Sequence, residues 1–183
     1  MAVKYYDWLD QHESVRPTKV AVRDLDAGIS LTYTELNDRA KALAGYLQSN
    51  GISKGDRVAL LVRNRPEFFE AQFACSKIGA ICLPLNWRLT VNELKYILED
   101  SSPDGLIHDH VFAKTANALT AELGTKISLE LADPMEASSY EEALAQKLGY
   151  TEVEATHDDV SMIMYTSGTT GHPKGAMITH GMV

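Results

Sequence analysis

Short apolar runs along this chain alternate with longer segments in which apolar residues recur at helical spacing. The run at 57–62 reads Arg-Val-Ala-Leu-Leu-Val, and the run at 160–165 reads Val-Ser-Met-Ile-Met-Tyr. Neither run alternates regularly between apolar and polar residues, so both faces of each strand are expected to be covered. Repeated strand–helix order is typical of α/β proteins. The sequence therefore predicts a mainly parallel sheet flanked by helices on both faces.

The same patterning sets the expected boundaries of the elements. Helices are expected at about 35–50, from Asn64 toward Gly79 and from Thr90 through Leu98, and over 111–123 and 140–148. Strands are expected at 20–22, 30–33, 57–62, 81–83, 105–108, 126–131, 160–165 and 176–179. No internal repeat or linker-like composition divides the chain, so residues 1–183 are read as one continuous unit.

Three candidate capping signals mark where helices begin. Thr34 offers a hydroxyl to the first long helix. Thr90 and Glu93 have the spacing of a capping box, in which a hydroxyl and a carboxylate satisfy backbone amides reciprocally. Asn64 and Glu67 have the same spacing and predict a second capping pair.

Size and charge exclude several classes of protein. The chain has 183 residues, 45% of them hydrophobic and 23% charged, which is within the globular range. Its net charge of −8 provides no broad basic surface for a polynucleotide, so nucleic-acid binding is not expected. The acidic residues are unevenly distributed: residues 160–183 contain none. An anion could therefore bind near the carboxyl-terminal end.

The cysteines and the amino-terminal residues point to a reducing compartment. Cys75 and Cys82 cannot build a disulfide framework and lack the spacing of a zinc site, so both are expected to be buried and no metal site is predicted. The first residues have no apolar leader, and no run approaches the roughly 18 apolar residues that span a bilayer. We therefore expect a cytoplasmic protein without a transmembrane segment.

The segment 166–175 is the most informative stretch for function. It contains three glycines, four hydroxyl side chains and Lys174, a combination that suits phosphate oxygens. A Walker A loop is not indicated, because Pro173 precedes the lysine and Gly175 follows it. The segment is expected to connect a β-hairpin whose second strand is 176–179. An ordinary solvated turn with one exposed lysine is the alternative.

The order of residues at 165–175, Tyr-Thr-Ser-Gly-Thr-Thr-Gly-His-Pro-Lys-Gly, resembles the phosphate-loop signature of the adenylate-forming superfamily. That superfamily includes acyl-CoA synthetases, aryl-CoA ligases, luciferases and the adenylation domains of peptide synthetases. The segments 31–36, 54–59 and 79–90 extend the resemblance in the same order. The stretch Pro-Leu-Asn-Trp-Arg-Leu at 84–89 looks most like fatty-acyl and aryl-CoA ligases.

This resemblance implies a reaction and a binding site. Such enzymes activate a carboxylic acid, here expected to be a fatty acid, with ATP and Mg²⁺. They form an acyl-adenylate with release of pyrophosphate and then transfer the acyl group to coenzyme A. By matching position, the ATP phosphates would be bound by Thr166, Ser167, Gly168, Thr169, Thr170, Gly171 and Lys174.

The resemblance also implies that the chain is incomplete. Residues 1–183 would be the N-terminal part of the large AMP-binding domain, without the rest of that domain or the C-terminal lid domain. We therefore expect no catalytic residue in this stretch, no activity from it alone, and self-association through surface that the missing part would cover. Trp87 and Tyr165 are expected to be packing residues. Asn86 and Arg88 are expected to have structural roles at a strand-to-helix corner.

Three alternatives to an acyl-CoA synthetase remain open at the level of sequence. The first is an adenylation domain that loads an amino or aryl acid onto a carrier protein. The second is a non-catalytic module that binds a nucleotide or another protein. A P-loop NTPase is the third, and the spacing around Lys174 disfavours it.

Overall fold

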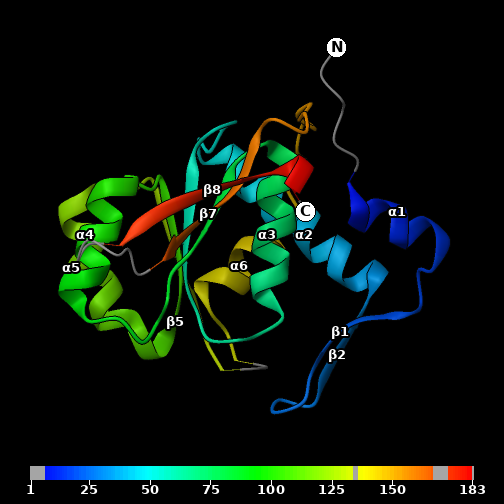
Figure 1. The fold of residues 1–183 in the computed structure, drawn as a ribbon. Coiled ribbons are helices and arrows are strands. Elements are labelled where there is room, and N and C mark those ends of the chain that lie inside the picture. The colour runs from blue at the N-terminus through cyan, green and yellow to red at the C-terminus, as the bar shows by residue number, and fades with distance from the viewer. Residues whose placement is uncertain (1–6, 134–135, 167–172, 183) are drawn as a thin grey trace.

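A computed structural model describes residues 7–133, 136–166 and 173–182. Its centre is a six-stranded sheet (Figure 1) in the order β6-β5-β3-β4-β7-β8. These strands are β3 (Arg57–Leu61), β4 (Ile81–Pro84), β5 (Gly105–Asp109), β6 (Ile127–Leu131), β7 (Val160–Thr166) and β8 (Lys174–Thr179). Every neighbouring pair is parallel except β7 with β8, which is antiparallel. The predicted mainly parallel sheet is confirmed.

A separate two-stranded ribbon precedes this sheet in the chain. It consists of β1 (Val20–Asp24) and β2 (Ile29–Thr32), which pair antiparallel. The helices are α1 (Trp8–Val15), α2 (Tyr33–Ser49), α3 (Glu67–Ile78), α4 (Val91–Ser101), α5 (Ala113–Leu123) and α6 (Ser139–Ala145). Two short 3₁₀ helices, η1 (His110–Phe112) and η2 (His180–Met182), complete the described elements. The described residues contain no helix that is both long and apolar enough to cross a membrane.

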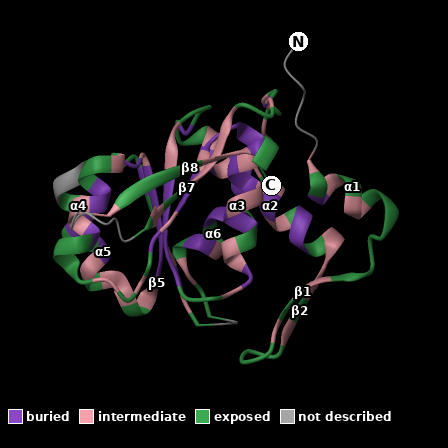
Figure 2. Ribbon diagram, in the orientation of Figure 1, coloured by how far each residue is buried: buried purple, intermediate pink, exposed green. Residues whose placement is uncertain are grey.

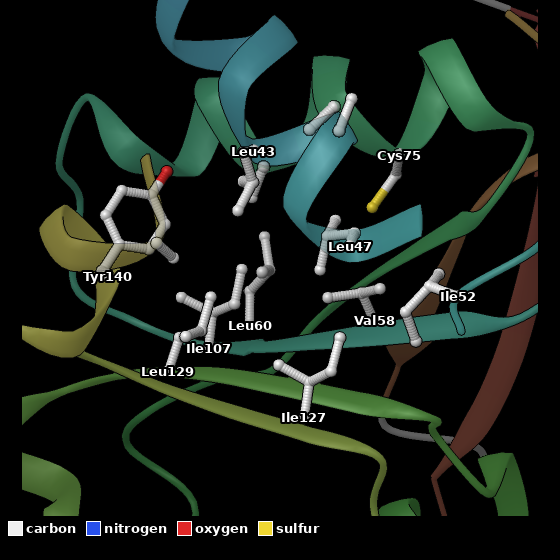
Figure 3. Packing of buried hydrophobic residues seen from close by; sticks show 14 of the residues in the cluster. Leu43, Leu47, Ile52, Val58, Leu60, Cys75, Ile107, Ile127, Leu129 and Tyr140 are labelled. Carbon is white, nitrogen blue, oxygen red and sulfur yellow. The ribbon is translucent and has the colours of Figure 1, made fainter. Parts of the chain in front are cut away.

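Helices α2 to α6 form two layers, one on each face of the sheet (Figures 1 and 2). Buried side chains of α2, α3 and α6 pack with Val58, Leu60 and Ile107 on one face, as Figure 3 shows. On the opposite face, side chains of α4 and α5 pack with Ala59 and Leu61. Adjacent residues of β3 thus point into different cores, as the alternation of a strand requires. The prediction of helices on both faces is confirmed.

The order of strands explains why the helices divide in this way. From β3 the chain passes through α3 to β4, and then α4 returns it past β3 to β5. Parallel crossovers are almost always right-handed, so a reversal of direction along the sheet moves the connecting helix to the other face. Helices α3 and α4 accordingly belong to different cores. The carboxyl ends of β3 and β5 lie side by side where this reversal occurs.

Two of the three expected helix starts need correction. The predicted Thr90–Glu93 capping box is present at α4. The cap of α2, however, is Thr32 rather than Thr34, because Thr32 and Glu35 form a second capping box. The predicted cap at Asn64 is wrong, since α3 has no side-chain cap.

The apolar face of α3 is also narrower than its phenylalanines suggest. Its fully buried apolar positions are Ala71, Ala74, Cys75 and Ile78, whereas Phe69 is 41% exposed. Small residues face the core because α2 packs closely against α3. Cys75 and Cys82 are both buried, as predicted, and burial raises the pKa of the Cys75 thiol to about 12.

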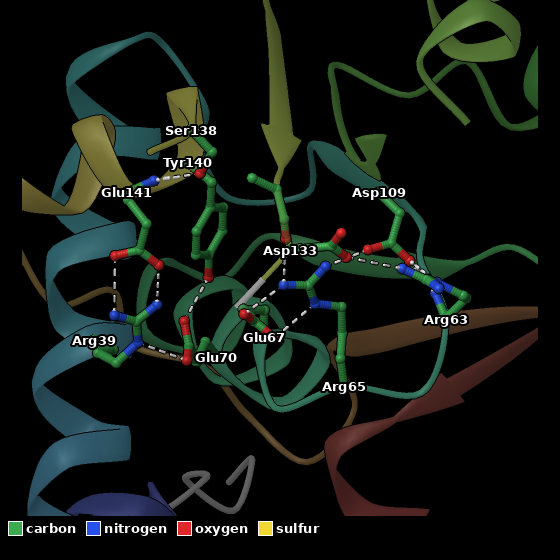
Figure 4. Close-up of polar contacts among 11 residues, drawn as sticks. Arg39, Arg63, Arg65, Glu67, Glu70, Asp109, Asp133, Ser138, Tyr140 and Glu141 are labelled. Carbon is green, nitrogen blue, oxygen red and sulfur yellow. Dashed lines mark hydrogen bonds and ion pairs between the residues drawn. The ribbon is translucent and has the colours of Figure 1, made fainter. Parts of the chain in front are cut away.

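A buried cluster around Glu70 joins the helices of one layer (Figure 4). The Glu70 side chain is 1% exposed and accepts hydrogen bonds from Arg39 Nε at 2.7 Å and from the Tyr140 hydroxyl at 2.8 Å. Arg39 also contacts Glu141 on α6 through two nitrogens, at 2.5 and 3.1 Å. These contacts link α2, α3 and α6 and satisfy both Glu70 oxygens, so we assign the cluster a structural role.

A second cluster lies where β3, β5 and β6 end (Figure 4). Asp109, the last residue of β5, is fully buried and accepts a hydrogen bond from the backbone N–H of Arg63 at 2.7 Å. Arg65 donates to Asp109, to both oxygens of Glu67 at 2.8 Å and to the Ala132 carbonyl at 3.1 Å. One guanidinium group therefore ties together the segments that follow three parallel strands and the start of α3.

The ionisation of Asp109 should be visible in the pH dependence of stability. Burial alone would raise the pKa of Asp109, but the backbone N–H of Arg63 and the charge of Arg65 outweigh burial and lower it. Because the folded-state pKa lies below the unfolded value of about 3.9, the stabilisation is complete above that value and is lost as the pH falls through the folded-state pKa. Asp109→Asn should therefore lower the free energy of unfolding at pH 7 by about 2–3 kcal/mol.

Urea unfolding followed by circular dichroism at pH 7 and pH 3 tests this expectation. The matched control is Asp133→Asn, because Asp133 is 60% exposed and lies 3.9 Å from Arg63. That control should change the free energy of unfolding by less than about 1 kcal/mol. An Asp109→Asn effect as large at pH 3 as at pH 7 would contradict the assigned role of the charge.

Candidate phosphate-binding hairpin

The β7–β8 hairpin opens at the edge of the sheet where the parallel strands end. Strand β7 runs parallel to β4, so Thr166 lies at the carboxyl edge, as do Leu61 and Asp109. Ligands of open α/β sheets bind outside the carboxyl ends of the strands. The hairpin connection is therefore at the edge where such a site is expected.

The hairpin ladder extends further than the sequence suggested. Strand β7 includes Thr166, and β8 begins at Lys174, two residues before the predicted start. The two residues are direct partners in the register, so their side chains lie on the same face of the hairpin. Both are exposed. Of the predicted phosphate-binding residues, these are the two that the structure brings together.

The remaining predicted phosphate-binding residues, Ser167, Gly168, Thr169, Thr170 and Gly171, lie outside the described residues. The hairpin itself, with antiparallel strands on either side of this segment, is confirmed. Thr166 and Lys174 thus define the two points between which the segment must run. Their pairing brings a hydroxyl and an ammonium group to the same end of the hairpin.

The charge around Lys174 favours an anion. Within the described part of the chain, no carboxylate forms an ion pair with Lys174, and residues 160–183 contain no acidic side chain. By contrast, Arg39 and Arg65 are each bound to carboxylates. An unpaired, exposed ammonium group beside a hydroxyl group can contribute both charge and a hydrogen bond to a phosphate oxygen.

The opposite face of the hairpin is occupied by packing residues. Tyr165 is the direct partner of Gly175, and its half-buried ring packs on the core that α4 and α5 cover. Its hydroxyl donates a hydrogen bond to Asp100 on α4. Burial raises the pKa of the Tyr165 phenol, and the bond to Asp100 raises it further. Packing was predicted for Tyr165, but the contact with Asp100 was not.

The residues between β4 and α4 make local contacts at a corner. Trp87 packs against the core of α4 and α5, as predicted. The Arg88 guanidinium lies 4.2 Å from the centre of the Trp87 ring, and the Asn86 side chain accepts a hydrogen bond from the Arg88 backbone N–H at 3.1 Å. The structural reading of Asn86 and Arg88 is consistent with these contacts. His180 is buried and begins η2.

The described residues contain no group of three or more His, Cys, Asp or Glu side chains arranged to hold a metal ion. The Thr166 hydroxyl is an oxygen donor on the strand opposite Lys174. Mg²⁺ is commonly bound through substrate phosphates and keeps several of its waters. These residues therefore fit an ion that arrives with a nucleotide better than an ion held in a protein cage.

Comparison with known proteins identifies the family of the chain. Residues 9–183 match the family described as AMP-binding enzyme. The chain is 40% identical to a feruloyl-CoA synthase from Amycolatopsis sp. over 95% of its own length and 33% of the relative. It is 37% identical to the long-chain-fatty-acid–CoA ligase FadD13 of Mycobacterium tuberculosis over 99% of its length and 36% of the relative. The chain thus spans about a third of the length of these relatives.

A solved structure supports the same assignment. The inhibitor-bound N-terminal domain of FACL13 from Mycobacterium tuberculosis superposes with a TM-score of 0.86 at 36% identity. The match covers 97% of this chain and 45% of that domain. With a family match over nearly its whole length and this agreement in fold, the chain belongs to the family of AMP-binding, adenylate-forming enzymes.

Proposed function

We propose that this chain supplies the phosphate-binding hairpin of an ATP-dependent acyl-CoA synthetase. The observation that carries the proposal is the pairing of Thr166 with Lys174 at the carboxyl edge of the sheet. Members of the family use ATP and coenzyme A, and both relatives described above are named as enzymes that form CoA thioesters. We extend the proposed site to Ser167, Gly168, Thr169, Thr170 and Gly171, which complete the motif.

The proposed reaction has two steps. In the first, a carboxylate oxygen of the acid attacks the α-phosphorus of ATP, and the bond to the bridging oxygen breaks so that pyrophosphate leaves with the electron pair. Negative charge increases on the leaving group, and Lys174 together with the hydroxyl of Thr166 would stabilise it. In the second step, the thiol sulfur of coenzyme A attacks the acyl carbon. AMP then leaves, and the thiol proton is released.

The proposed ligands follow from this chemistry. Mg²⁺ would accompany the ATP phosphates and neutralise part of their charge. The acid is proposed to be a fatty acid, in keeping with the FadD13 relative, while the feruloyl-CoA synthase makes an aryl acid the second choice. The partner is thus a small-molecule carboxylic acid rather than a nucleic acid. We propose a cytoplasmic location because ATP and coenzyme A are abundant there and both cysteines are unpaired.

We also propose that residues 1–183 form the N-terminal part of a larger AMP-binding domain, because they correspond to about a third of the relatives' length. The charged groups buried in the described residues are bound to one another and serve the fold. No catalytic acid, base or nucleophile is therefore assigned in this stretch, which would bind the nucleotide and stabilise the leaving pyrophosphate while residues outside it complete the reaction.

Substitution of the exposed lysine tests the proposed phosphate site. Lys174→Ala should weaken binding of Mg-ATP by about tenfold or more, because a charge-assisted contact with a phosphate is lost. Isothermal titration calorimetry on the 183-residue chain measures this change. Lys114→Ala is the matched control, since Lys114 is also exposed but lies on α5. Equal affinities for the two variants would exclude Lys174 from the site.

A coupled pyrophosphate assay tests the proposal that this stretch does not catalyse on its own. The purified chain, incubated with Mg-ATP, coenzyme A and either fatty or aryl acids, should release no pyrophosphate above the rate without acid. A longer protein that includes this stretch should release pyrophosphate and form the thioester. Turnover by the 183-residue chain would overturn the proposal, and ATP binding without turnover by the longer protein would favour a non-catalytic nucleotide-binding module.

We further propose that the chain self-associates through β8. This strand pairs with β7 on one side and is the last strand of the described sheet. Met177 on β8 is 66% exposed and Met164 on β7 is 45% exposed. Unpaired edges with apolar side chains promote association. Light scattering should show a mass that rises with concentration, and Met177→Lys should reduce it. A constant monomer mass would rule out this proposal.

A further inference from the structure

The ring of Tyr165 lies directly against Gly175, across the two strands of the hairpin. A Cβ atom at position 175 would come within 3.1 Å of Tyr165 Cζ and 3.0 Å of Ile163 Cγ2. Both distances are shorter than ordinary van der Waals contact, so a side chain at position 175 would require the ring or Ile163 to shift by a few tenths of an ångström. Gly175 is a strand residue. The absence of a side chain at this position therefore leaves room for the tyrosine ring.

Asp100 contacts the same ring through its hydroxyl group. Figure 1 shows the turn end of the hairpin directed toward α4, and the hydroxyl of Tyr165 donates a hydrogen bond to Asp100 near the end of that helix. Tyr165 is thus fixed by its ring at Gly175 and by its hydroxyl at Asp100. Since Tyr165 precedes Thr166 and Gly175 follows Lys174, these contacts act at the last rungs before the connecting segment.

The two faces of the hairpin carry different side chains near its turn end. Alternation along a strand directs Tyr165 and Thr166 to opposite faces, and the same holds for Gly175 and Lys174. Packing on one face can therefore set the strand register that presents Thr166 and Lys174 on the other. We propose that Asp100, Tyr165 and Gly175 are positioning residues that hold Thr166 and Lys174 in register for the ATP phosphates. This inference rests on the proposed function of the hairpin.

The position of Asp100 supports a role beyond the stability of its helix. Asp100 lies in the last turn of α4, where a negative charge interacts unfavourably with the helix dipole. Nearby Glu99 has the same charge and is exposed, and it pairs with Lys95 at 3.9 Å. Removal of either charge should leave α4 as stable as before or slightly more stable. Loss of Asp100 should in addition loosen the hairpin, which gives the two substitutions different outcomes.

Paired substitutions test the proposal on the 183-residue chain. Tyr165→Phe removes the hydroxyl and keeps the ring, with Tyr46→Phe as the matched control. Asp100→Asn removes the charge, with Glu99→Gln as its control. Hydrogen exchange at the amides of 162–166 and 174–178, thermal unfolding and Mg-ATP titration are measured for each protein. Tyr165→Phe should speed exchange at these amides by about tenfold, the effect expected for one hydrogen bond to a charged acceptor.

The same variants should weaken Mg-ATP binding by about threefold to tenfold, with a smaller effect for Asp100→Asn because an amide oxygen still accepts the bond. Both controls should match the original chain, and Asp100→Asn should not lower the unfolding temperature. The proposal is overturned if exchange and affinity in Tyr165→Phe equal those of Tyr46→Phe. It is also overturned if affinity changes only in proportion to the unfolding temperature.

The exchange measurement separates this proposal from the proposed function. If the original chain binds no Mg-ATP while Tyr165→Phe still speeds exchange at the hairpin, the nucleotide site is wrong and the positioning contacts stand. Gly175→Ala should also speed exchange by displacing the ring, and it should do so less in a chain that already carries Tyr165→Val. Equal effects of Gly175→Ala in both backgrounds would show that the glycine does not act through Tyr165.

Discussion

The five strands from β6 to β7 run in one direction, and this constraint governs where everything else can lie. Parallel strands need crossover connections, so their carboxyl ends gather at one edge and helices cover both faces. Polar groups at this edge are then needed to form hydrogen bonds with the backbone where it leaves each strand. Arg65 meets part of this need by binding Asp109, Glu67 and the Ala132 carbonyl. The proposed nucleotide site lies at the same edge.

The arginines that stabilise the fold differ from the proposed phosphate-binding lysine in having carboxylate partners. Arg39 and Arg65 have carboxylate partners and link elements that are distant in sequence. Lys174 has no such partner within the described residues and stands in an acid-free part of the chain. A bound carboxylate would compete with a phosphate for its charge. Without an ion-pair partner among the described residues, the ammonium group of Lys174 is available to a ligand.

The sequence predicted those features that depend on contacts between residues close together in the chain. The Thr90–Glu93 box, the apolar strands and the hairpin around 166–175 depend on neighbouring residues and were found. Thr34 was chosen wrongly because Thr32, two residues earlier, has its own Glu partner three residues on. Burial of Glu70 could not be predicted, since it requires Arg39 and Tyr140 from other elements. The hydrogen bond between Tyr165 and Asp100 was not predicted for the same reason, since the two residues are 65 positions apart in the chain.

The position of Gly175 changes how the glycines of the 165–175 motif should be understood. From sequence, all three glycines suit close approach of the backbone to phosphate oxygens. The structure indicates a further reason for Gly175, since an added Cβ would press on Ile163 and on the ring of Tyr165. A motif that looks like a single ligand-binding unit can therefore combine two requirements, one for the ligand and one for the strand that presents the lysine. Replacement of Gly175 by a larger residue would disturb both requirements. Its effect on nucleotide binding can therefore arise without any contact between residue 175 and the phosphates.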